Sequence, residues 1–111
     1  MLEDRIEGRL DELRRLGKDL ADAAALRFQL EHARKAVIAT AMKTAEAKGH
    51  TTAAAQEREA YASAEYDTWL RGATEAVREH ERLRLEWSVI DKRFEAWRTL
   101  EATKRAEMQF T

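Results

Sequence analysis

The stretch that decides the fold is Tyr66–Met108, YDTWLRGATEAVREHERLRLEWSVIDKRFEAWRTLEATKRAEM. Along it, one set of positions recurs in steps that alternate between three and four residues. This set, the heptad seam, consists of Tyr66, Trp69, Ala73, Ala76, His80, Leu83, Trp87, Ile90, Phe94, Trp97, Glu101, Lys104 and Met108. A strict period of 3.5 residues predicts a helix with a partner helix alongside, in coiled-coil-like packing. We therefore expect Tyr66, Trp69, His80, Leu83, Trp87, Ile90, Phe94 and Trp97 to lie in the core or in an oligomer interface.

The helix that carries the seam is predicted to be very long. Ser63 is a natural N-cap, and no stop signal follows before the end of the chain, so we expect a helix over about 65–111. Such a helix is about 70 Å long, whereas a compact domain of this size is only about 30 Å across. The helix must pack on another long helix, on a second subunit, or on both. Leu85, Val89 and Leu100 lie off the seam and suggest a second buried face, so we predict a homo-oligomer.

The first half of the chain predicts a second long helix. Apolar residues recur at helical spacing from Leu2 through Leu20, and nothing breaks the pattern before Lys48-Gly49. We expect one helix over about 2–48, bent near Gly17, and a short helix over about 53–61 capped by Thr51 or Thr52. The predicted fold is all-α, a single helical domain over 1–111 in which two long helices form an antiparallel hairpin with a short connecting helix.

The composition excludes several classes of protein. The chain has 111 residues with no Pro, no Cys and four Gly, which argues against a β-sandwich or barrel and excludes disulfides and thiolate metal sites. No apolar run approaches about 20 residues, so we expect no membrane span. The net charge of -1 argues against a polyanion binder that works by bulk charge alone.

Catalytic patterns are missing from the sequence. None of His32, His50 and His80 has a second histidine three or four residues away, so no helical two-histidine metal site forms. The sequence has no Gly-rich phosphate loop and no GxSxG motif. We expect no enzyme, no metal and no cofactor.

The distribution of charge along the chain is more informative than the net charge. Segments 32–50 and 92–105 each carry a net charge of +3. Repeated basic patches in an oligomer can follow a phosphate backbone, and neighbouring aromatic residues can stack on bases. The simpler interpretation is a solvated helix face. The candidate contacts to nucleic acid are Arg34, Lys35, Lys43, Lys48, Arg98, Lys104 and Arg105.

The order of these features resembles a known family. A basic-apolar helix (RKAVIATAM) ends at KGH, a connector with QEREAYAS follows, and a long helix with an aromatic centre completes the chain. Over roughly 33–110 this resembles the UvsY-like recombination mediators of T-even phages. The resemblance implies an all-helical oligomer that binds single-stranded DNA and helps a RecA-type recombinase load in place of a single-strand-binding protein. It also implies a cytoplasmic, phage- or prophage-encoded protein in a bacterial host.

Lys35 and Lys48-Gly49 match the basic positions of this pattern, whereas the apolar run Val37–Ala41 lacks the further basic residues that the family has there. The alternative is a helical structural or adaptor protein that binds another protein and no nucleic acid. The acidic-leaning first helix and the long seam fit this second interpretation equally well. Basic residues gathered on one outward surface would favour DNA, and basic residues distributed and paired with Glu would favour the adaptor.

Overall fold

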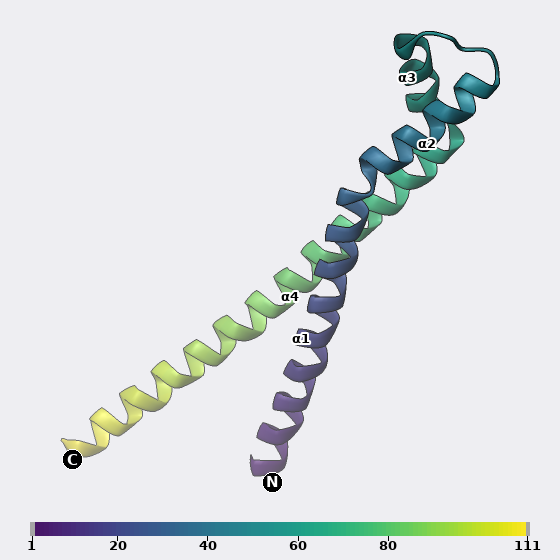
Figure 1. The fold of residues 1–111 in the computed structure, drawn as a ribbon. Helices are drawn as coiled ribbons and strands as arrows, with labels where there is room; N and C mark the ends of the chain where they lie inside the picture. Colours follow the sequence, from purple (N-terminus) through teal and green to yellow (C-terminus); the bar gives the residue numbers. More distant parts are fainter. Residues whose placement is uncertain (1, 111) are drawn as a thin grey trace. The chain divides into compact units, whose positions relative to one another are not determined.

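A computed structural model describes residues 2–110, most of which lie in four helices. These are α1 (Leu2–His32), α2 (Arg34–Ala47), α3 (Ala53–Tyr61) and α4 (Ala64–Gln109), shown in Figure 1. No strand occurs within residues 2–110, which confirms the predicted all-α class. None of the helices in that range is long and apolar enough to cross a lipid bilayer.

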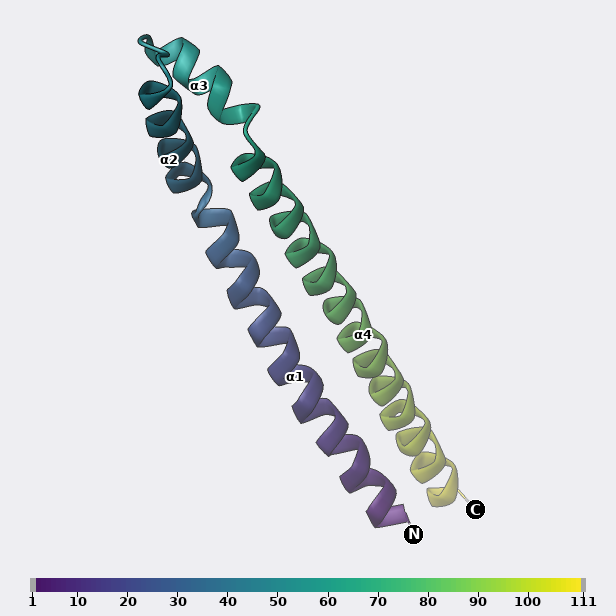
Figure 2. The ribbon, with the colours of Figure 1, turned by 90° about the vertical axis from the view of Figure 1, so that its right-hand side faces the viewer.

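The chain divides into two compact units. Unit 1 comprises Met1–Leu20 and Glu81–Thr111, and unit 2 comprises Ala21–His80. In unit 1 the first part of α1 and the last part of α4 run in opposite directions, as Figure 2 shows. In unit 2 the end of α1 and the first part of α4 are also antiparallel. The predicted antiparallel pairing is thus present in each unit, whereas the single domain, the coiled-coil packing and the oligomeric state stay predictions.

The predicted single helix over 2–48 is wrong at one point, because it is interrupted at Ala33, while α1 continues through Gly17. Ala33 keeps right-handed helical angles, with φ -77° and ψ -11°, so the cause lies in the hydrogen bonds. The Leu30 carbonyl, which a continuous α-helix would offer to the N–H of Arg34, accepts the indole Nε1–H of Trp69 at 2.8 Å. It also accepts the Ala33 N–H at 3.2 Å. A side chain inserted into the backbone ladder is a known cause of helix breaks.

Gly17 lies beside the Trp87 ring in unit 1. A Cβ atom at this position would lie 3.4 Å from Cζ3 of that ring, which is an ordinary van der Waals distance. The indole of Trp87 is therefore close to the α1 backbone.

The connections from α2 to α3 and from α3 to α4 have the turn and cap residues that the sequence predicts. Gly49 has a φ of +104°, a left-handed conformation that favours glycine, just after the end of α2. Thr52 Oγ1 accepts the Ala55 N–H at 3.2 Å, and Ser63 Oγ accepts the Tyr66 N–H at 3.2 Å. These caps begin α3 and α4. The bounds of α3 coincide with the expected 53–61, while α4 begins one residue earlier than expected and ends at Gln109; Thr111 lies outside the described residues.

The buried residues of α4 all belong to the heptad seam. They are Ala73, Ala76 and Leu83, with exposed fractions of 9%, 5% and 5%. In unit 2 the α2 and α3 helices pack on each other, and their buried residues are again alanines, Ala41, Ala45 and Ala60. Small side chains let helix backbones approach closely, so α2 and α3 bury little side-chain volume between them.

The remaining seam residues differ along α4. Tyr66, Trp69, His80 and Ile90 are half-buried, whereas Trp87, Phe94 and Trp97 are 38%, 47% and 49% exposed. The expected second buried face is not buried within the chain, because Leu85, Val89 and Leu100 are 67%, 42% and 60% exposed. The chain therefore covers the seam well at its beginning and poorly at its end.

The Trp69 indole should contribute measurably to stability. The Trp69→Phe variant keeps an aromatic ring and removes the donor to the Leu30 carbonyl, so we expect a loss of about 1 kcal/mol in the free energy of unfolding. Urea denaturation followed by circular dichroism measures it. The matched control is Trp97→Phe at a half-exposed ring, for which we expect a smaller change. Equal effects of the two substitutions would contradict the role assigned to the Trp69 N–H.

Candidate binding surfaces

The first candidate surface surrounds Arg34, at the start of α2. Its Nη2 donates a hydrogen bond to the Tyr61 hydroxyl at 3.1 Å, and its Cζ lies 5.8 Å from the centre of the Tyr61 ring. Tyr61 meets Tyr66 edge to face at 5.1 Å, and Tyr66 lies 5.5 Å from Trp69. The break in the helix after His32 and the end of α3 thus bring a cation against a row of three aromatic rings. This cluster lies wholly in unit 2.

The charge of Arg34 is permanent. Hydrogen bonding to Tyr66, followed by the electrostatic interaction with Tyr61, raises the pKa of its guanidinium above the ordinary value. An arginine is already protonated at any physiological pH, so the contacts orient the group and do not switch it. Both Arg34 and Tyr61 are exposed to solvent, so a ligand can reach the guanidinium and the ring.

The other predicted basic residues of unit 2 are spread around α2. Lys35, Lys43 and Lys48 are all exposed. At 100° per residue, Arg34, Lys35 and Lys43 span about half the helix circumference, and Lys48 lies just beyond the helix end as its C-cap. Only Arg34 contacts the aromatic cluster, and Lys35 follows it directly in the sequence. The predicted set is therefore present on one helix but not in one row.

The predicted basic residues of unit 1 lie near the end of α4. Arg98 and Arg105 are exposed and share one side of the helix, because seven residues are close to two turns. Lys104 pairs with Glu101 across 3.6 Å. These three residues belong to unit 1, and Arg34, Lys35, Lys43 and Lys48 belong to unit 2.

Most of the other ion pairs join residues one helical turn apart. They are Arg14–Asp11, Arg27–Glu31, Arg71–Asp67, Arg78–Glu75, Arg82–Glu86 and Arg84–Glu81. Pairs of this type are typical of a solvated helix face and contribute little to stability. They neutralise much of the positive charge outside the candidate basic sets.

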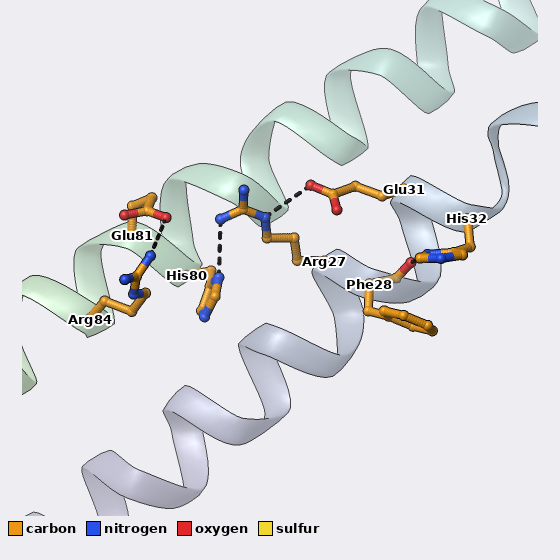
Figure 3. A network of polar contacts seen from close by, with 7 residues as sticks. All are labelled: Arg27, Phe28, Glu31, His32, His80, Glu81 and Arg84. Carbon is orange, nitrogen blue, oxygen red and sulfur yellow. Dashed lines mark hydrogen bonds and ion pairs between the residues drawn. The ribbon is translucent and has the colours of Figure 1, made fainter.

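A polar contact links α1 to α4 within unit 2 (Figure 3). Arg27 Nη1 donates to Nδ1 of His80 at 3.2 Å, while Arg27 Nε donates to Glu31 Oε1 at 2.9 Å. Because a guanidinium can only donate, Nδ1 of His80 is the acceptor in this contact. His80 is thus a half-buried contact residue of the seam. His32 is placed elsewhere, where its Nδ1 donates to the Phe28 carbonyl at 2.8 Å and its ring stacks on Phe28.

The second candidate surface is a groove in unit 1 between the α1 and α4 segments. Its volume is about 460 Å³. Its floor, which we call the unit-1 groove floor, is formed by Ile6, Leu10, Leu13, Ile90, Phe94 and Trp97. Phe94 and Trp97 lie with ring centres 5.7 Å apart. A groove lined by half-exposed apolar side chains is a docking surface for apolar groups.

The rim of this groove contains residues that the sequence analysis missed. Arg5, Arg9 and Arg93 line it together with Glu12. Arg5 and Arg9 are spaced i, i+4 beside the apolar residues Ile6 and Leu10. That spacing is the signal that could have placed them along the apolar face.

Within residues 2–110 the structure contains no group of three His, Asp or Glu side chains that could hold a metal ion. Comparison with protein-family models, with curated proteins and with solved structures gives no match for this chain. The functional case therefore rests on the Arg34 cluster and on the unit-1 groove.

The Arg27–His80 contact should couple the two helices energetically. In a double-mutant cycle with Arg27→Met and His80→Leu, we expect a coupling energy of about 0.5–1.5 kcal/mol, because one partner is charged and the contact is part-buried. Thermal or urea unfolding of the four proteins measures it. A parallel cycle on Arg14 and Asp11, whose side chains are 80% and 64% exposed, should give less than about 0.5 kcal/mol. Equal coupling in both cycles would argue against a structural role for His80.

Proposed function

We propose that this chain is a DNA-recombination accessory protein that binds single-stranded DNA. In this role it holds the strand while a RecA-type recombinase loads in place of a single-strand-binding protein. The observation that carries the proposal is the exposed Arg34 guanidinium held 5.8 Å from the centre of the Tyr61 ring, with Lys35 beside it. It is supported by the resemblance of the helix order to the UvsY-like mediators.

The chemistry of this cluster matches what an unpaired strand offers. A single strand presents phosphates at a regular spacing and base faces that are free to stack. Arg34 and Lys35 supply cations for phosphates, and Tyr61 supplies an exposed ring for a base. Because every base has a π-face, such a contact is tolerant of sequence, as a mediator requires.

The additional basic residues extend the same mode of binding. Lys43 and Lys48 on the α2 side, and Arg98, Lys104 and Arg105 on α4, are exposed and offer further phosphate contacts. The proposed action is positioning, with no covalent chemistry by the protein.

Fluorescence anisotropy with a labelled oligonucleotide tests the proposal. We expect binding by the unaltered chain at micromolar concentration in 50 mM salt. Tyr61→Ala should weaken it on the order of tenfold through lost stacking, whereas Tyr61→Phe should retain most of it. Arg34→Ala and Lys35→Ala should each reduce the slope of log affinity against log salt by about 0.7.

The matched control is Arg14→Ala in unit 1, which removes a cation already paired with Asp11 and should leave binding unchanged. Circular dichroism verifies that each variant keeps its helices. Absence of binding by the unaltered chain, or an Arg14→Ala effect as large as that of Arg34→Ala, would remove the proposal.

A second candidate function is a helical adaptor that binds another protein. It is favoured by the ion pairs that join several arginines to carboxylates one helical turn away. It is also favoured by the exposed apolar residues Leu85, Val89 and Leu100 of α4. The same anisotropy experiment separates the two functions. An adaptor shows no affinity for the oligonucleotide at any salt concentration, and Arg34→Ala then changes nothing.

A further inference from the structure

We propose that the unit-1 groove is the surface on which a second copy of this chain docks. In the paired state, segment 2–12 of α1 in each copy lies along segment 92–105 of α4 in the other. The aromatic and aliphatic residues of the unit-1 groove floor are then covered from both sides. This proposal does not rest on the Arg34 cluster, which belongs to unit 2. Of the proposed phosphate contacts, only Arg98, Lys104 and Arg105 lie in segment 92–105.

The exposed area of the groove is the first support. Phe94 and Trp97 are 47% and 49% exposed, and a fully buried aromatic side chain covers about 150–250 Å². These two rings therefore offer roughly 200 Å² per copy. Ile6 and Leu10, each 42% exposed, add to this area. A stable interface buries about 800 Å² per partner, about 65% of it apolar in homodimers. The groove supplies a large part of that apolar core.

The spacing of the groove residues indicates the kind of partner. Ile90, Phe94 and Trp97 continue the heptad seam at steps of four and three residues. A seam with this period packs against helices that carry the same period. A second copy brings two such helices of matching length, since Ile6, Leu10 and Leu13 of α1 repeat the same steps.

The charge of unit 1 favours a second copy of the chain over a strongly charged partner. Segment 2–12 carries five acidic and two basic residues, a net charge of -3, and segment 92–105 carries five basic and two acidic residues, a net charge of +3. Unit 1 as a whole carries twelve of each sign. A highly charged partner gains little from such a surface, whereas a second copy matches the acidic segment of each chain with the basic segment of the other.

Sedimentation or light scattering on the full chain at several concentrations tests this pairing. The unaltered protein should reach at least twice the 12.8 kDa mass of one chain, with a concentration-dependent blue shift of its tryptophan fluorescence. Phe94→Glu places a carboxylate in the groove and should weaken self-association at least tenfold. The matched control is Thr99→Glu, which adds the same charge to the same segment at an exposed polar residue outside the groove; it should associate like the unaltered chain.

Circular dichroism checks that Phe94→Glu keeps its helices. If this variant does not fold, Ile6→Gln on the α1 side of the groove replaces it as the groove variant. Reduced association in either folded groove variant, together with normal association of Thr99→Glu, supports the docking surface. A single-chain mass for the unaltered protein at 100 µM overturns it. Equal loss in the groove and control variants overturns it as well, because association is then not specific to the groove.

Discussion

The hydrogen bond from the Trp69 indole to the Leu30 carbonyl organises unit 2. It occupies the carbonyl that would otherwise continue the α-helix, so α1 ends at His32 and α2 starts at Arg34. The new helix start holds Arg34 against Tyr61, and Tyr66 connects that pair to the Trp69 ring. The same indole therefore fixes both the helix break and the setting of the candidate nucleic-acid contact. One such hydrogen bond contributes only about 1 kcal/mol to the free energy of unfolding, but its position determines where α1 ends and where Arg34 lies.

The two units differ in the size of the side chains that they bury. Unit 2 buries alanines, so its helices are held by close backbone approach and by polar contacts such as Arg27–His80. In unit 1 the large residues of the seam stay partly exposed, with Leu16 and Leu83 as the well-buried pair. Area buried, not the number of aromatic residues, determines the hydrophobic stabilisation. The three tryptophans thus contribute less to a single chain than their number suggests, and the exposed part of their surface is available for association.

Sequence reasoning captured what depends on local spacing and end chemistry. The register of the seam gave the buried positions Ala73, Ala76 and Leu83, and the Thr52 and Ser63 caps marked the starts of α3 and α4. It failed where a residue distant in the sequence determines the local structure. The sequence around Ala33 contains no signal for a helix end, because the break is caused by Trp69 on another helix. It also missed the tyrosines around Arg34, since Tyr61 and Arg34 are 27 residues apart. The rim arginines were missed because i, i+4 charges were attributed to solvated faces.

The alanine-lined contacts of unit 2 limit which substitutions the chain can accept. Ala60 is completely enclosed, with an exposed fraction of 0%, and Ala41 and Ala45 are nearly so. A residue with even two more methyl groups has no space there unless the helix axes move apart. These sites should therefore admit only glycine or serine during mutational drift, while neighbouring surface positions vary freely. In a deep mutational scan, most substitutions at these three positions would reduce stability, whereas substitutions at the surrounding exposed positions would be tolerated.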